Sequence, residues 1–140
     1  MRYLGLDLGT KTLGVALSDI TLTIASSYKT INFSEADYNS LIPMIDDLIK
    51  EFNISKIILG LPKNMNNSLG ERAETTIKFQ KLLEDNLKIE VVLQDERLST
   101  VEATNYMLES DISRKKRKKK IDSLAATIIL QTYLNKERVK

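Results

Sequence analysis

Three acidic residues stand where carboxylates could hold a metal ion: Asp7, Glu96 and Asp122. Asp7 lies between Leu6 and Leu8 in an apolar run, where an unpaired carboxylate carries a large desolvation cost unless it is paired or binds a metal. The three residues are therefore candidates for one metal site, of the kind that activates water for hydrolysis.

The composition restricts that metal to one held by oxygen. The chain has no cysteine and no histidine, which excludes disulfides, thiolate zinc sites, a thiol nucleophile, and an imidazole base or ligand. Carboxylate, carbonyl and water oxygens suit Mg²⁺ or Mn²⁺. The sequence therefore predicts Mg²⁺ or Mn²⁺ as the cofactor.

Each of the later two carboxylates also has a simpler interpretation. Asp95 and Glu96 follow a strand-like run and should point to opposite faces, so only one of them can join Asp7. The alternative is an exposed strand end paired with Arg97. Asp122 stands at the predicted start of a helix, where a carboxylate more commonly caps backbone amides and opposes the helix dipole. The residue pattern leaves capping and metal binding both open.

Seven consecutive basic residues form a basic block just before Asp122: Arg114, Lys115, Lys116, Arg117, Lys118, Lys119 and Lys120. The formal net charge is +2, so the rest of the chain is net negative, and this concentration indicates an anionic partner. A solvated run without a role is the alternative. We expect the block to be a mobile segment between two helices, beside the proposed metal site, where it neutralises the backbone of a nucleic acid.

The apolar pattern predicts a single α/β domain over residues 1–140, with a mixed sheet of three antiparallel and then two parallel strands and helices on both faces. Strands are expected over residues 3–8, 13–18, 24–33, 57–60 and 89–93. Helices are expected over residues 41–52, 68–83 and 99–108 and from 121 onwards. Ser40 is the expected cap of the first helix, and Ser68 with Glu71 forms a capping box for the second. Without a membrane-spanning run or a signal-peptide core, the chain is expected to be a soluble cytoplasmic protein.

Four motifs extend over nearly the whole chain: Asp7-x-Gly9-x-Lys11-x-x-Gly14-Val15-Ala16-x-Ser18-Asp19, Gly60-Leu61-Pro62 with Gly70-x-Arg72-Ala73, Asp95-Glu96-Arg97-Leu98, and Asp122-x-x-Ala125-Ala126. In order and spacing they resemble the YqgF/RuvX family of ribonuclease H-like nucleases. The first motif also resembles the phosphate hairpin of actin-like and sugar-kinase ATPases. Those proteins close two lobes over a nucleotide, and this chain has room for one.

The resemblance implies a ribonuclease H-like fold in which Asp7, Glu96 and Asp122 hold one or two Mg²⁺ or Mn²⁺ ions. It implies a nuclease that processes the 5′ end of precursor 16S ribosomal RNA, with Holliday-junction resolution in branched DNA as the alternative. A non-catalytic nucleic-acid-binding module, in which the carboxylates cap and pair, is the competing class. Candidate phosphate contacts are Lys11, Lys63, Arg72, Arg97 and the basic block, since the loop after Lys63 leads into a helix start.

Overall fold

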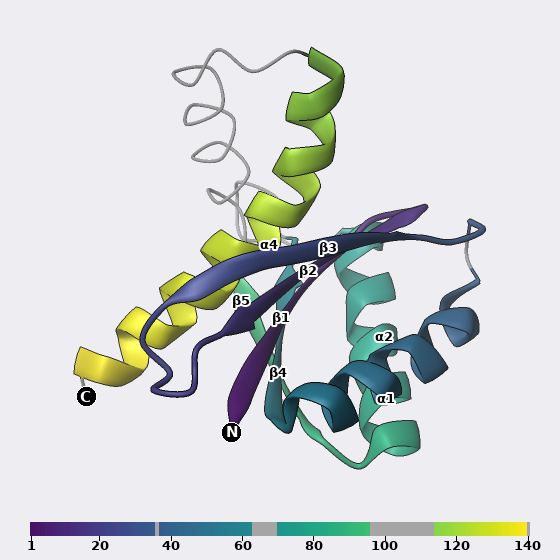
Figure 1. The fold of residues 1–140 in the computed structure, drawn as a ribbon. Coiled ribbons are helices and arrows are strands. Elements are labelled where there is room, and N and C mark those ends of the chain that lie inside the picture. Colours follow the sequence, from purple (N-terminus) through teal and green to yellow (C-terminus); the bar gives the residue numbers. More distant parts are fainter. Residues whose placement is uncertain (36, 63–69, 96–113, 140) are drawn as a thin grey trace.

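A computed structural model shows the fold of the chain and describes residues 1–35, 37–62, 70–95 and 114–139 (Figure 1). For residues 71, 114–123 and 138–139 it describes the backbone alone. The expected helix over residues 99–108 lies outside the described residues.

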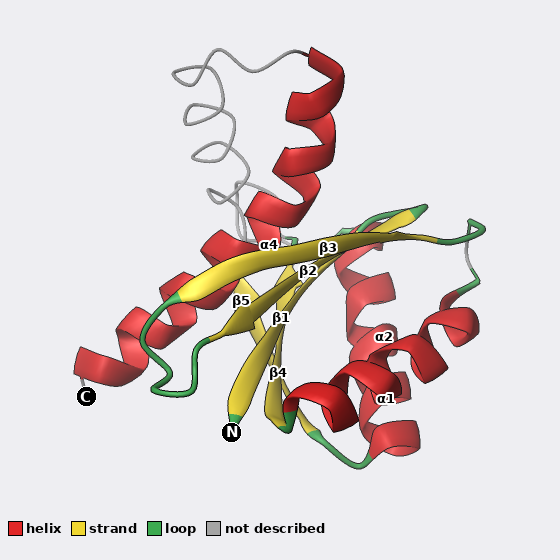
Figure 2. Cartoon of the chain, in the orientation of Figure 1, coloured by secondary structure: helices red, strands yellow, loops and turns green. Residues whose placement is uncertain are grey.

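Five strands form one sheet in the order β3-β2-β1-β4-β5 (Figure 2). They are β1 (Arg2–Leu8), β2 (Thr12–Ser18), β3 (Ala25–Asn32), β4 (Ile54–Leu61) and β5 (Glu90–Asp95). The first three are antiparallel neighbours, β4 runs parallel to β1, and β5 runs parallel to β4. The predicted mixed sheet is therefore confirmed, strand by strand.

Helices cover both faces of the sheet, as predicted. They are α1 (Leu41–Phe52), α2 (Glu71–Leu87) and α4 (Arg114–Val139), and a short 3₁₀ turn, η1 (Tyr38–Ser40), leads into α1. In Figure 1, α1 and α2 lie on one side of the sheet and α4 crosses the other. None of the helices in the described part of the chain combines the length and apolar character that a membrane span requires.

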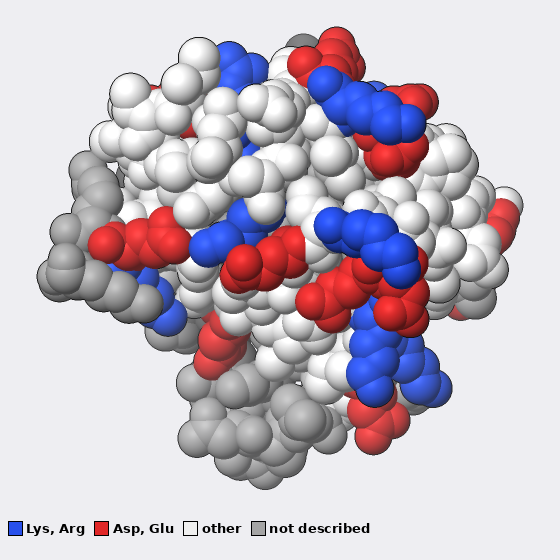
Figure 3. Space-filling view, turned by 90° about the horizontal axis from the view of Figure 1, so that it is seen from below, with Lys and Arg blue, Asp and Glu red and all other residues white. Residues whose placement is uncertain are grey.

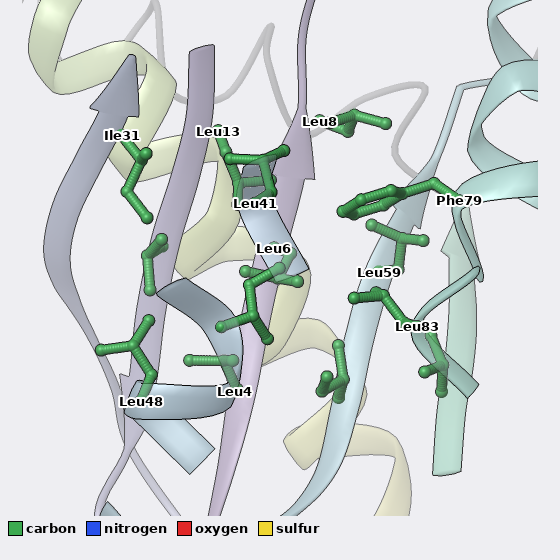
Figure 4. Close-up of a cluster of buried hydrophobic side chains, with 14 of the residues drawn as sticks. Leu4, Leu6, Leu8, Leu13, Ile31, Leu41, Leu48, Leu59, Phe79 and Leu83 are labelled. Atoms are coloured by element: carbon green, nitrogen blue, oxygen red, sulfur yellow. The ribbon is translucent and has the colours of Figure 1, made fainter. Parts of the chain in front are cut away.

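The hydrophobic core follows from the two-residue alternation of the strands. On β1, Leu4, Leu6 and Leu8 belong to the larger buried cluster, which α1 and α2 complete (Figure 4). Tyr3 faces the other way and belongs to the smaller cluster, which includes Leu130 of α4. Burying each large apolar side chain stabilises the fold by about 1.5–3 kcal/mol, so this alternation assigns each strand residue to one face.

Ser40 stands at the predicted N-cap position of α1 but does not cap the helix with its side chain, and the predicted cap of α2 is wrong. Ser40 makes no capping bond to α1; its backbone is already helical, and its hydroxyl donates to the carbonyl of Asp37 at 2.8 Å. The chain thus enters α1 through the 3₁₀ turn and needs no separate cap. The cap of α2 is Gly70, in extended conformation, rather than Ser68.

Helix α4 begins earlier than predicted. It starts at Arg114 rather than near Ile121, so the basic block is helical backbone and not a mobile link between helices. Lys and Arg have high helix propensity, and no Gly or Pro interrupts the sequence from 114 to 139. These first turns extend beyond the sheet in Figure 1. Asp122 lies in the interior of α4, so its interpretation as a residue capping the helix start is also wrong.

Candidate active site

Asp7 is half-buried on the face of β1 that α4 covers. On β2 its paired residue is Gly14. On β4 the residue after Leu59 is Gly60, and Leu59 pairs with Leu6. Strand alternation puts both glycines on the same face as Asp7. Because glycine has no side chain, neither neighbouring strand places a side chain directly beside this carboxylate.

The packing of α4 against β1 depends on Gly5. A Cβ atom on Gly5 would lie 2.8 Å from Cβ of Leu130 and 3.0 Å from the carbonyl oxygen of Ala126, so only glycine lets the helix come this close. Nearer the start of β1, the rings of Tyr3 and Tyr133 lie 6.1 Å apart. Strand and helix therefore run in opposite directions, and residues of α4 before Ala126 lie toward the end of β1.

Polar contacts to β3 show the same register. The Gln131 side chain accepts from the amide of Ala25 at 2.8 Å and donates to the carbonyl of Thr23 at 2.9 Å. One turn earlier on α4, the hydroxyls of Thr127 and Ser27 are 2.8 Å apart. Advancing two residues along the strand thus corresponds to going back four along the helix.

The carboxyl ends of β5 and β1 lie at the same end of the sheet. Leu61 pairs with Asp95, and all three strands β1, β4 and β5 are parallel. The side chain of Gln94 accepts a hydrogen bond from Lys136 of α4 at 3.4 Å, so it lies on the face that α4 covers. Asp95, the next residue, therefore lies on the opposite face from Asp7.

A pocket of about 320 Å³ opens at the end of β1, on the side of the sheet that carries α1 and α2. Its lining residues are Leu8, Gly9, Thr10, Glu35, Tyr38, Arg72, Thr75 and Thr76. The Gly9 amide donates to the carbonyl of Thr12 at 2.8 Å and closes the hairpin. Arg72 Nη2 donates to the carbonyl of Leu8 at 3.4 Å. The fold thus brings Arg72 to the glycine turn, and exposed Lys11 lies on the same hairpin.

Of the three predicted metal ligands, the structure places one side chain. Among the described residues, no three acidic side chains converge on one point. Glu96 lies outside the described residues, as do Lys63 and Arg97. Only the backbone is described for Asp122 and the basic block. The ligand set remains a prediction, and Asp7, on the face that α4 covers, is the one member whose side chain is located.

Asp19, the last residue of the first motif, has a structural role in the turn between β2 and β3. Its carboxylate accepts hydrogen bonds from the amide of Ile24 at 3.0 Å, the hydroxyl of Thr21 and the amide of Thr23 at 2.7 Å. These bonds, with that of Ile24 the largest, lower the pKa of Asp19 to about 2. The turn then presents Thr23 to α4.

The opposite end of the sheet carries charges of both signs. Figure 3 views that end from below, where positive and negative side chains interleave. Lys56 lies there over the rings of Tyr3 and Tyr133 and donates to the Tyr133 hydroxyl at 3.0 Å and to Glu137 at 3.3 Å. Burial opposes the charge of Lys56, but these hydrogen bonds outweigh it and raise its pKa. The charge of Lys56 at this end is therefore paired within the protein.

Sequence reasoning missed two sets of site residues. Gly14 and Gly60 lie within recognised motifs, and a glycine inside a strand is a signal of close approach that could have revealed them. Glu35 and Tyr38 lie between a strand and a helix without any motif, so no pattern in the sequence indicates that they line a pocket.

Comparison with known proteins gives a consistent result. The family model described as "RuvX: Holliday junction resolvase" matches residues 1–136. A protein of Bacillus subtilis (strain 168), named "Putative pre-16S rRNA nuclease", is 50% identical over 135 residues, covering 96% of this chain and 98% of that protein. A protein of Caldanaerobacter subterraneus subsp. tengcongensis with the same name is 48% identical over 139 residues, covering 99% of each.

Two solved structures share the fold. T. thermophilus RuvC in complex with a Holliday junction substrate aligns with a TM-score of 0.61 and 13% identity, covering 98% of this chain and 96% of that one. The fowlpox virus Holliday junction resolvase aligns with a TM-score of 0.55 and 18% identity, covering 98% and 99%. At these identities the likeness concerns the fold alone.

Proposed function

The chain belongs to the RuvX family, and we propose that it is a metal-dependent nuclease that processes the 5′ end of precursor 16S ribosomal RNA in the cytoplasm. Residues 1–140 act as one nuclease domain, with Mg²⁺ or Mn²⁺ held by Asp7, Glu96 and Asp122. The names of the relatives support an RNA substrate. The family description supports branched DNA as the second candidate.

The observation that carries this proposal is the antiparallel register of α4 on β1. From Gly5, the step to Asp7 covers about 6.6 Å along the strand. From Ala126, the step back to position 122 covers about 6 Å along the helix. Both steps lead toward the same end of the molecule. The register therefore supports a site in which Asp122 acts beside Asp7.

The sheet supports the third ligand. Glu96 directly follows Asp95, the last residue of β5, and β5 ends at the same end of the sheet as β1. Neighbouring strands are about 4.8 Å apart, so β5 is about 10 Å from β1. Gly60 on the intervening strand contributes no side chain. This spacing suits two carboxylates that reach toward one ion from either side.

The donor set fits the metal. Carboxylates around a half-buried position supply the oxygen ligands that Mg²⁺ and Mn²⁺ prefer, and such an ion, when bound, activates water and stabilises the charge that develops on the phosphate. The chain itself contributes position and charge. Asp7 is held in place by backbone pairing on β1, and Arg72 and Lys11 offer donors to the phosphate backbone at the same end of the sheet, as we propose also for Lys63 and Arg97.

The basic block adds affinity that does not depend on sequence. Arg114 to Lys120 form the first turns of the same continuous helix that carries Asp122. Nucleic acid bound along these turns is thereby directed to the end of the sheet where Asp7 lies. Neutralisation of phosphates with release of counterions supplies this affinity.

The test of the metal site is the variant Asp7→Asn. We expect it to lose cleavage and Mn²⁺ binding, while unfolding at the same temperature as the parent or slightly higher, because one of several crowded carboxylates is neutralised. Substrates are a precursor 16S RNA fragment with its 5′ leader, a four-way DNA junction and single strands. Asp47→Asn, an exposed carboxylate on α1, is the matched control. Unchanged cleavage and Mn²⁺ affinity in Asp7→Asn would show that Asp7 is not a ligand.

The test of the basic block is the quadruple replacement of Lys115, Lys116, Lys118 and Lys119 by Gln, which keeps high helix propensity. Binding should weaken for all nucleic acids alike. The salt dependence should flatten by roughly one unit of slope for each phosphate that the variant no longer neutralises. Saturating substrate should restore much of the turnover. A salt slope equal to that of the parent contradicts this role.

A further inference from the structure

The pocket beside the end of β1 offers opposite charges and an aromatic ring within a small volume. Its volume of about 320 Å³ lies at the low end of the range for small-molecule sites, about 300–1,000 Å³. Arg72 contributes a guanidinium, Glu35 a carboxylate, and Thr10 and Thr75 hydroxyls. A pocket of this size takes a ligand no larger than a single nucleotide and not a duplex.

Part of the pocket wall is held in place before any ligand arrives, whereas Glu35 and Arg72 are exposed side chains. The ring of Tyr38 lies 5.8 Å from that of Phe33 and 5.9 Å from that of Phe79, so the core holds it in place. A Cβ atom on Gly9 would lie 3.1 Å from the carbonyl oxygen of Thr12, which shows how tightly the hairpin closes. Arg72 is held by its bond to the Leu8 carbonyl. Such preorganisation lowers the entropic cost of binding.

The place of the pocket in the sheet also favours a ligand. In the sheet, β2 and β3 lie on one side of β1, and β4 and β5, which follow in the sequence, lie on the other side. In open α/β sheets, ligands bind outside the carboxyl ends of the strands at such a switch point. Leu8 lines the pocket, and the preceding residue, Asp7, faces the other side of the sheet. A nucleic-acid strand that crosses the end of β1 therefore contacts both the pocket and Asp7.

The charges identify the ligand as a nucleotide rather than a bare anion. Glu35 would repel a phosphate that filled the pocket, whereas the guanidinium of Arg72 attracts one at its side. Carboxylates characteristically accept hydrogen bonds from ribose hydroxyls in nucleotide sites. The 2′-hydroxyl is also the group by which proteins distinguish RNA from DNA.

We propose that this pocket binds one ribonucleotide of the RNA strand next to the cleaved bond, with Arg72 on its phosphate and Glu35 on its 2′-hydroxyl. The proposal rests on the proposed nuclease function and makes RNA, rather than DNA, the preferred substrate.

The experiment titrates adenosine 5′-monophosphate, its 2′-deoxy analogue and inorganic phosphate into the full chain without divalent metal, followed by NMR of the Gly9 and Thr10 amides. The ribonucleotide should shift both amides and bind about three- to tenfold more tightly than the deoxynucleotide, the effect of one hydrogen bond. Equal affinities for the two nucleotides, or phosphate binding as tightly as the ribonucleotide, would overturn the proposal.

Variants assign the contacts. Glu35→Ala should bind both nucleotides with the affinity of the parent for the deoxynucleotide, and Arg72→Ala should weaken both. Arg72→Lys keeps the charge without the planar guanidinium and should give an intermediate loss. Glu51→Ala, an exposed carboxylate on α1, is the control and should match the parent. The unfolding temperature of each variant is measured, and a Glu35→Ala protein that is folded and keeps the preference refutes the role of Glu35.

Titration and cleavage assays of the parent protein separate this proposal from the nuclease assignment. A parent protein that prefers the ribonucleotide but cleaves no substrate with Mn²⁺ present refutes the proposed function alone. Cleavage by the parent without any ribonucleotide preference refutes the pocket alone.

Discussion

Replacing Gly5 by alanine tests how α4 is positioned against the sheet. The added Cβ would lie 2.8 Å from Cβ of Leu130 and 3.0 Å from the Ala126 carbonyl oxygen. Favourable carbon contacts begin near about 3.5 Å, so the helix has to move or the strand has to bend. The Leu130 Cβ and the Ala126 carbonyl oxygen are fixed by the backbone of α4, so they cannot rotate away as the end of a long surface side chain could.

The size of the effect follows from two opposing terms. Overpacking a core costs about 1–3 kcal/mol. Alanine in place of glycine within a strand recovers about 0.5–1 kcal/mol of backbone entropy. The free energy of unfolding should therefore fall by up to about 2.5 kcal/mol, which lowers the melting temperature by up to roughly 10 °C in a domain of this size. Gly5→Val should cost more than Gly5→Ala, because two further methyl groups enter the same contact.

Urea unfolding and thermal melting measure the change, with Ser26→Ala on exposed β3 as a control that should lie within about 0.5 kcal/mol of the parent. Cleavage is measured at a temperature where Gly5→Ala is folded. A displacement of about 1 Å at the active site can cost about a hundredfold in rate, so activity should fall further than the folded fraction does. If Gly5→Ala and Gly5→Val are both as stable as the parent, α4 does not rest on Gly5 and the register argument fails.

Three further outcomes are expected. Lys56→Met should lower the free energy of unfolding by about 1–3 kcal/mol in urea titrations, because Tyr133 loses a charged hydrogen-bond partner and a cation above its ring. Since hydrogen bonds lower the pKa of Asp19 to about 2, below its unfolded value of about 3.9, its contribution to stability should be complete above pH 4 and be lost as the pH falls toward 2. Melting curves across this range should show that loss in the parent and not in Asp19→Asn. Gln131→Leu should lower the free energy of unfolding, measured by thermal melting, by about 1–3 kcal/mol. The Thr23 carbonyl and the Ala25 amide each lose the hydrogen bond that Gln131 makes to them.

The strands and the faces of the sheet could be predicted from sequence because they depend on local alternation. Leu4, Leu6 and Leu8 specify one face of β1, and a shift of one residue would expose all three. The position of Asp7 on the other face follows from the same period. The motifs likewise led to the family, since they occur in order along the chain.

Helix boundaries were less predictable, because competing local signals are resolved by tertiary context. Ser68 and Glu71 match a capping box, yet α2 begins after Gly70. The basic block looks like a solvated link by charge alone, yet Lys and Arg are good helix formers and the block continues α4 back to Arg114. In both cases the residues permit two structures, and sequence spacing does not choose between them.

By itself, the sequence determined the order of the elements, the apolar faces and the presence of Asp7 among leucines, because each depends on neighbours within a few residues. Only the tertiary structure decided that Gly14 and Gly60 flank Asp7, since strand register joins residues far apart in the chain. It also decided that Glu35 shares a pocket with Arg72. These groups meet because the hairpin and α2 reach the same end of the sheet, and non-local packing of this kind leaves no pattern in a linear sequence.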